Sequence, residues 1–203
     1  LTEELQWLPC PLVLDVATGT GRLPRALFRQ PGFDGRVIGL DLSRKMLHEA
    51  VRATAPFADR LTLIWQDAEN LPFADDTFDA VTCLEALEFM PHPLLVLAEM
   101  VRVLRPGGVL LTTNRIGHQA RLLPGRTFTR HQMEEHLQSL PLEQIRIRAW
   151  QVEYELIWAR KTGTQRGGGM RPLPQLLRCP KCRGAVAYAD GCLECLTCII
   201  RYP

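Results

Sequence analysis

The sequence predicts an α/β fold, in which a doubly wound parallel sheet is followed by a small cysteine-rich module. Three observations carry this prediction. Residues 13–21, VLDVATGTG, combine a buried strand, an acidic residue and a paired-glycine turn. Strand-like and helix-like patterns then alternate along the chain, which is typical of parallel sheets. Finally, five of the seven cysteines fall in the last 25 residues with paired spacing, which indicates a metal site.

The first strand and its turn form a predicted ligand site. The apolar residues 12–14 are typical of a central strand buried on both faces. Gly19 and Gly21 allow a tight turn, and residues 22–30 have helical composition. Exposed backbone N–H groups and the helix dipole at such a helix start favour negative charge.

Asp15 and Pro24 decide between two ligands for this turn. Pro24 stands where a dinucleotide-binding fingerprint carries its third glycine. The carboxylate of Asp15 would repel a pyrophosphate, but it attracts the cationic amino-acid end of a ligand. The pair therefore favours S-adenosylmethionine over NAD.

The second strand, 36–40, ends in a second candidate ligand residue. Asp41 follows the glycine turn by about twenty positions, where a carboxylate can accept hydrogen bonds from both ribose hydroxyls. Ser43 is a predicted N-cap for the next helix. Met46 falls in the first turn of that helix, where core packing is the simplest role.

Two further segments follow predicted strands. The side chain of Asp67 is a candidate acceptor for an adenine amino group, with the backbone N–H of Ala68 as donor, although a purely turn-forming Asp is the alternative. Cys83 and Leu84 close the fourth strand at its carboxyl end, where open α/β sheets bind ligands. Nothing near Cys83 in sequence would stabilise a thiolate nucleophile.

The remaining elements complete a seven-stranded sheet with a terminal antiparallel hairpin. Their apolar periodicity, and a capping box at Thr129, predict strands at 61–65, 78–82, 109–113, 143–150 and 152–160, and helices at 2–8, 93–104 and 130–139.

The C-terminal cysteines fit tetrahedral thiolate coordination of one zinc ion. Two Cys-x-x-Cys pairs, separated by twelve residues, each present two sulfurs close enough to share one metal. Four thiolates leave no position for water, so such a zinc would be structural. A set that uses Cys192 is also well spaced, and iron–sulfur or redox chemistry is the main competitor. The preferred ligands are Cys179, Cys182, Cys195 and Cys198.

The motifs VLDVATGTG, VIGLD at 37–41, QDAENLPFADDTFDAV at 66–81 and VLRPGGVLL at 103–111 resemble those of class I S-adenosylmethionine-dependent methyltransferases. The subgroup includes quinone-biosynthesis and tRNA wobble-uridine enzymes. The resemblance spans roughly residues 12–161 and implies a Rossmann-like fold. Many relatives carry a paired histidine after the fourth strand, where this chain has Glu88-Phe89. The resemblance implies that the cofactor is contacted by Asp15, Ala17, Thr18, Gly19, Gly21, Asp41, Leu42, Met46, Asp67, Ala68, Cys83 and Leu84.

The closing CxxCxxxYP looks like the end of a zinc-ribbon family, the activators of tRNA, rRNA and release-factor methyltransferases. We therefore expect three parts: residues 1–160 as the methyltransferase domain, 161–175 as a flexible basic linker and 176–203 as a zinc ribbon. The ribbon family usually continues past the Tyr-Pro, and the chain opens on Leu1, so both ends are candidates for truncation.

Charge and hydropathy limit the expected location and binding partners of the protein. The formal net charge is +2, and between positions 156 and 189 there are seven basic residues and no acidic one. That run is either a solvated linker or a contact for a phosphate backbone. No apolar run reaches transmembrane length, so we expect a cytoplasmic protein with no membrane contact and no obligate partner.

Three functions follow, in descending order. The first is methylation of RNA or of a translation-related macromolecule, which the ribbon and the basic run favour. The second is methylation of a small lipophilic or natural-product acceptor. The third is a non-catalytic module that binds the cofactor. His92 and His118 lie in loops on the ligand side and are candidate bases, but the catalytic residues stay unassigned.

Overall fold

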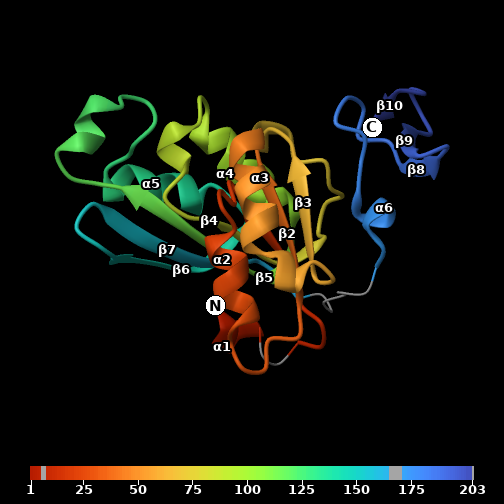
Figure 1. Ribbon diagram of the computed structural model, residues 1–203. Coiled ribbons are helices and arrows are strands. Elements are labelled where there is room, and N and C mark those ends of the chain that lie inside the picture. The colour runs from red at the N-terminus through yellow and green to blue at the C-terminus, as the bar shows by residue number, and fades with distance from the viewer. Residues whose placement is uncertain (6–7, 165–170, 203) are drawn as a thin grey trace.

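The computed structural model describes residues 1–5, 8–164 and 171–202. They contain a seven-stranded sheet in the order β3-β2-β1-β4-β5-β7-β6 and a separate three-stranded sheet in the order β10-β9-β8. In Figure 1 the small sheet lies beyond β3, at the opposite side from the β6–β7 hairpin. The predicted fold class is confirmed.

The large sheet is built from seven strands, and short helices separate them. The strands are β1 Leu12–Val16, β2 Arg36–Asp41, β3 Leu61–Trp65, β4 Phe78–Cys83, β5 Leu104–Arg115, β6 Leu142–Ala149 and β7 Tyr154–Lys161. The α-helices are α1 Thr2–Leu5, α2 Arg22–Phe28, α3 Arg44–Ala53, α4 Pro93–Val103, α5 Arg130–Gln138 and α6 Leu173–Leu176. The 3-10 turns are η1 Ala55–Phe57, η2 Ala68–Asn70, η3 Leu87–Phe89 and η4 Gln119–Leu122.

The C-terminal part, which we call the ribbon, starts at residue 176. It holds β8 Val186–Ala189, β9 Cys192–Cys195 and β10 Arg201–Tyr202, each antiparallel to its neighbour.

Strand direction places one edge of the large sheet at the ligand side. β1 to β5 are mutually parallel, and β7 is antiparallel to both β5 and β6. Arg115 at the end of β5 is therefore paired with Tyr154 at the start of β7. The carboxyl ends of five strands and the β6–β7 turn meet at this edge, where open α/β sheets bind ligands.

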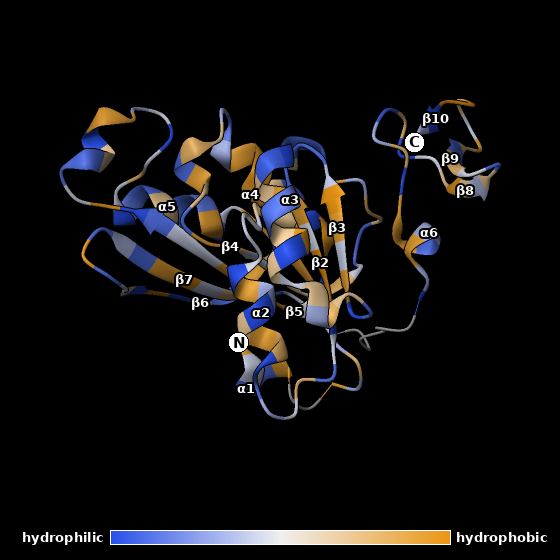
Figure 2. Ribbon diagram, viewed as in Figure 1, coloured by the Kyte–Doolittle hydropathy of each residue, from blue (hydrophilic) through white to orange (hydrophobic). Residues whose placement is uncertain are grey.

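The sheet separates two apolar layers. Leu12, Leu14 and Val16 point into a large core that includes residues of α4 and α5, whereas Val13 points into a smaller core with residues of α1 and α2. This alternation follows from the period of two along a strand. In Figure 2, β3 is predominantly orange while α3 carries several blue turns, as expected of helices that cover a buried sheet.

One buried ion pair joins three neighbouring strands, β1, β4 and β5. The side chain of Asp79 is 1% exposed and accepts hydrogen bonds from Arg105 Nε at 2.5 Å and from the backbone N–H of Leu12 at 2.7 Å. The same pair explains one difference from prediction. β5 starts at Leu104 rather than 109, because Leu104 pairs with Phe78 and Arg105 reaches Asp79. The Pro-Gly-Gly segment then interrupts the β4–β5 register, with Gly107 at a φ of +74°.

The segment that links the two sheets is more ordered at its ends than its composition predicts. Lys161 lies within β7, and its Nζ donates to the carbonyl oxygens of Val101 and Leu104. Leu173–Leu176 forms α6, in which Leu176 is fully buried. The centre of the predicted linker, 165–170, lies outside the described residues.

Candidate functional site

The glycine turn is held close against β2. Gly19 and Gly21 have φ values of +56° and +74°, which favour glycine, and Gly21 is the N-cap of α2. The backbone N–H of Thr18 donates to Leu40 O at 3.0 Å. A Cβ added at Gly39 would lie 2.9 Å from Thr18 Oγ1, so β2 needs glycine there to let the turn approach.

A cavity of about 410 Å³ opens over this turn. That volume lies within the range of roughly 300–1,000 Å³ that is typical of small-molecule sites. Five of the predicted residues line it: Asp15, Ala17, Thr18, Gly19 and Leu84. The rest of its wall was not predicted and consists of Thr20, Arg22, Leu23, Glu85, Trp150 and Gln151.

Asp15 is a buried carboxylate in the wall of this cavity. Its Oδ2 accepts a hydrogen bond from Thr18 Oγ1 and its Oδ1 accepts one from Thr82 Oγ1, both at 2.7 Å. Burial raises the pKa of Asp15 to about 6, although the two hydroxyl donors lower it in part. The group is therefore poised to ionise when a cation arrives.

Asp41 joins β2 to the glycine turn. Its Oδ2 accepts from the backbone N–H of Gly19 and its Oδ1 from that of Ser43, both at 2.8 Å. Each carboxylate oxygen has a second lone pair, so both can accept one further donor, such as a ribose hydroxyl. The Ser43 side chain caps α3 by accepting from Met46 N, as predicted.

The predicted adenine contacts lie beside the cavity rather than in its wall. Asp67 is exposed, and its Oδ1 accepts from the N–H of Glu69, so the turn-forming role is present. Ala68 is buried. Leu42 and Met46 are 63% and 39% exposed, so both side chains are accessible to a ligand.

The side chain or Cα of two other predicted residues is buried. Gly21 is buried and shapes the turn. The Cys83 side chain is fully buried, and burial, together with Asp15 and Glu88, raises the pKa of its thiol well above the usual value. The buried, protonated thiol is therefore unsuited to act as a nucleophile. At this strand end, the peptide groups of Cys83 and Leu84 are available to contact a ligand.

A second buried polar cluster lies at the same edge of the sheet and was not predicted. Glu88 in η3 is 1% exposed, and its Oε1 accepts a hydrogen bond from the hydroxyl of Tyr154 at 2.5 Å and lies 3.5 Å from Arg115 Nη1. Burial and the Glu88 carboxylate raise the pKa of Tyr154. Among the described residues, Glu88 Oε2 and Arg115 Nε are buried without a hydrogen-bond partner. Such atoms are rare outside functional sites.

Arg115 also lines a second cavity, of about 530 Å³, next to the end of β5. Its wall includes Ile116, His118, Arg121 and Phe128, and no acidic residue. Of the two candidate bases, His118 therefore lies in a cavity wall. His92 instead is exposed and its Nδ1 lies 3.0 Å from Glu69 Oε1.

The four predicted metal ligands come together in the ribbon. The sulfurs of Cys179, Cys182, Cys195 and Cys198 all lie within 4.8 Å of one another. Tetrahedral zinc with Zn–S bonds of about 2.3 Å needs sulfurs roughly 3.8 Å apart, so the set fits this ion. Backbone N–H groups of Thr197 and Cys198 approach Cys195 Sγ at 3.4 Å, as in metal-binding knuckles. Cys192 is outside the cluster, and its sulfur donates to Ala189 O.

Four of the seven basic residues in this run make side-chain contacts within the chain. Lys161 pairs with Asp76, Arg183 with Glu99, and Arg160 with Glu4. The guanidinium of Arg178 donates to two nearby carbonyl oxygens. These charges are therefore less available to a phosphate backbone than the sequence pattern predicts.

Comparison with known proteins agrees with this geometry. Residues 14–112 match the family described as "Methyltransferase domain". A demethylmenaquinone methyltransferase of Symbiobacterium thermophilum is 44% identical over 107 residues, which cover 52% of this chain and 43% of that protein. The chain thus matches less than half of the length of this curated relative.

Solved structures show the same fold at low identity. A chain from the complex that contains the Trm112 methyltransferase activator of Haloferax volcanii has a TM-score of 0.62 and 22% identity, covering 80% of this chain and 88% of that one. The [4+2]-cyclase SpnF has a TM-score of 0.67 and 19% identity, covering 79% of each chain. Because a cyclase shares the fold, the fold alone does not fix the reaction.

The sheet order, the glycine turn, Asp15 within β1 and Asp41 at the end of β2 are those of a Rossmann-like methyltransferase fold. The family match therefore runs from Leu14 in β1 to Thr112 in β5, across the strands and the glycine turn that carry this fold. Among the described residues, no helix combines the length and apolar composition needed to cross a membrane.

Proposed function

We propose that this chain transfers a methyl group from S-adenosylmethionine to a small lipophilic acceptor of the quinone kind. The observation that carries the proposal is the 44% identity with a demethylmenaquinone methyltransferase across the domain that holds the cofactor cavity. The internal pairing of the basic run supports this acceptor over RNA. The acceptor class that sequence alone ranked second is therefore the better supported one.

The cofactor would be held by the residues around the glycine turn. Asp41 accepts hydrogen bonds from the ribose hydroxyls, and ionised Asp15 faces the amino group, directly or through water. Asp67 and the N–H of Ala68 bind the adenine edge, while Leu42 and Met46 cover its faces and lose their exposure. Ala17, Thr18, Gly19 and Leu84 contribute to the remaining wall, while the buried Gly21 and Cys83 shape the turn and the strand end behind it.

The acceptor would occupy the cavity beside Arg115. The sulfonium of the bound cofactor supplies an already activated methyl group, so the protein mainly aligns the acceptor and excludes water. Arg115, oriented by Glu88, Tyr154 and an ion pair with Glu153, would donate a hydrogen bond to an acceptor oxygen. Ile116 and Phe128 would pack against an apolar ring.

Four thiolates of the ribbon would hold one structural zinc ion.

A translation-related acceptor is the second candidate function. The cysteine cluster and the likeness to a chain from a Trm112 complex favour it.

Calorimetric titration of the zinc-loaded full chain with S-adenosylmethionine, and separately with NAD, tests the cofactor. Methyl transfer from radiolabelled S-adenosylmethionine is then measured to reduced demethylmenaquinone in detergent and to total tRNA, with Asp41→Ala as the control that loses cofactor. Label in the quinone supports the proposal. Label in RNA alone would overturn the acceptor, and absence of S-adenosylmethionine binding would overturn the cofactor and the reaction class.

A further inference from the structure

One loop is shared between the proposed adenine site and the ribbon. After β3 the chain runs through Asp67 and Ala68 into η2 and then along residues 70–74. Asp67 caps η2, so its side-chain position depends on this turn keeping its shape. The same turn continues into residues that the ribbon contacts. The inference below rests on the proposed function of Asp67 and Ala68.

The ribbon holds this loop through backbone-directed hydrogen bonds. Asn70 Nδ2 donates to the carbonyl oxygen of Pro180 at 2.5 Å, and the N–H of Arg178 donates to Pro72 O at 2.8 Å. The N–H of Ala74 donates to Leu176 O at 3.0 Å. Pro180 lies inside the first Cys-x-x-Cys pair, so one metal-binding knuckle contacts the loop directly.

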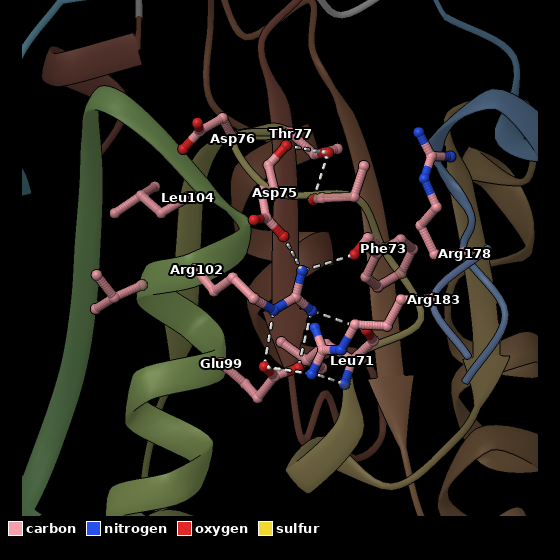
Figure 3. A network of polar contacts seen from close by, with 12 residues as sticks. Leu71, Phe73, Asp75, Asp76, Thr77, Glu99, Arg102, Leu104, Arg178 and Arg183 are labelled. Atoms are coloured by element: carbon pink, nitrogen blue, oxygen red, sulfur yellow. Dashed lines mark hydrogen bonds and ion pairs between the residues drawn. The ribbon is translucent and has the colours of Figure 1, made fainter. Parts of the chain in front are cut away.

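A buried carboxylate of α4 accepts hydrogen bonds from both the knuckle and the same loop. Glu99 is 6% exposed; its Oε2 accepts from the N–H of Leu71 at 3.0 Å, and its Oε1 accepts from Arg183 Nη2 at 3.0 Å. Arg102 also binds Glu99 and donates to the carbonyl oxygens of Leu71 and Phe73. Figure 3 shows the Glu99, Arg102 and Arg183 side chains converging beside Leu71.

The position of Arg183 depends on the fold of the knuckle. The N–H of Arg183 donates to Cys179 O at 2.8 Å, and the N–H of Cys179 donates to Gly184 O at 2.9 Å. Arg183 adopts a φ of +58°, which an unconstrained arginine rarely does. A metal that fixes Cys179 and Cys182 therefore also fixes Arg183, the residue that connects the knuckle to Glu99.

We propose that Arg183 and Asn70 are positioning residues for the cofactor: they tie the 67–74 loop to the first knuckle and hold Asp67 and Ala68 in place for the adenine ring. The metal in the four-cysteine cluster and S-adenosylmethionine then bind with positive coupling. Thermodynamic linkage requires the effect to be reciprocal, so the cofactor must also strengthen retention of the metal.

The reciprocal effects are measured on the zinc-loaded full chain. Arg183→Ala and Asn70→Ala each weaken S-adenosylmethionine binding at least about fivefold in calorimetry, the lower end of typical coupling. Arg183→Lys restores part of the loss because it keeps a donor to Glu99. Arg201→Ala is the matched control, because Arg201 pairs with Glu194 inside the ribbon, and it binds like wild type.

The second measurement is the equilibrium occupancy of zinc in a chelator buffer. With saturating S-adenosylmethionine, the wild-type dissociation constant for zinc falls at least about fivefold, and in Asn70→Ala this gain shrinks. Asn70 lies outside the ribbon, so its variant tests the link even where Arg183→Ala fails to retain metal.

Two results would overturn the coupling while leaving the methyltransferase intact: Asn70→Ala that binds the cofactor like wild type, or zinc affinity that ignores the cofactor. A wild-type chain that retains zinc but binds no S-adenosylmethionine would overturn the proposed function, and this inference with it.

Discussion

The methyltransferase domain and the ribbon are stabilised by different means. The domain has a continuous apolar core on one face of its sheet and a smaller one on the other. In the ribbon, the only fully buried side chains among its described residues besides Leu176 are the thiols of Cys179 and Cys195. A metal must therefore supply the cohesion that apolar burial supplies in the domain, and the two parts should respond differently to the same perturbation.

Removing the metal should produce the largest difference between the two parts. Structural zinc sites contribute about 10–16 kcal/mol of apparent binding energy, so Cys179→Ser should unfold the ribbon while the domain stays folded. Hydrogen exchange checks this, since amides of β8 and β9 should lose protection while those of β1 and β4 keep it.

Cys192→Ser is the matched control for that experiment, because this cysteine lies in the ribbon but outside the cluster. It should keep both the metal and the protection of β9. Unchanged protection of the ribbon after complete removal of metal would contradict the comparison.

Local patterns explain why much of this architecture was predictable. The strand, turn and acidic residue around Asp15 occupy consecutive positions, and the cysteine pairs disclose their metal site through spacing. The Glu88–Tyr154 contact joins residues 66 positions apart, and it exists only because β7 pairs with β5. No spacing rule could have found it.

Charge gave a weaker guide, because a sequence does not show which partner a charged residue will have. Lys161 and Arg183 look like part of a free basic linker, yet their partners, Asp76 and Glu99, lie more than eighty positions earlier. The start of β5 at Leu104 likewise involves Asp79, which pairs with Arg105 from the neighbouring strand β4.

Asp79→Asn probes the other side of the comparison, the stability of the domain itself. Breaking a buried ion pair on one side costs about 3–5 kcal/mol, because the neutral amide removes the negative charge that faces the buried Arg105 guanidinium. We expect the free energy of unfolding to decrease by the same amount. Denaturant titration, monitored by tryptophan fluorescence, measures this decrease. Glu135→Gln, at an exposed pair with His131, should cost less than about 1 kcal/mol. Equal effects of the two variants would show that the pair is not buried in solution.

Asp41→Ala should weaken S-adenosylmethionine binding by about 1.5–3 kcal/mol, the scale of hydrogen bonds to a charged group. The loss combines the ribose contacts with the Gly19 and Ser43 N–H bonds that shape the turn. Isothermal calorimetry measures it, and Asp34→Ala, an acidic residue in the loop before β2, serves as control. Unchanged affinity in Asp41→Ala would remove the ribose assignment.

The smallest expected effect is a dependence of cofactor binding on pH through Asp15. Burial raises the pKa of this carboxyl to about 6, so folding favours its protonated form, and the group's contribution to stability falls as pH rises from 3.8 to about 6. Binding of a cationic amino group needs the ionised form of Asp15. Cofactor affinity should therefore increase with pH over the range in which this contribution to stability decreases. S-adenosylmethionine affinity should rise by up to about tenfold, or roughly 1.4 kcal/mol, between about pH 5 and about pH 7. Calorimetry across this range on wild type and Asp15→Asn separates Asp15 from the ligand's own titration, because the variant should bind more weakly and lose the slope. A variant that keeps the wild-type slope would place the cationic end of the cofactor away from Asp15.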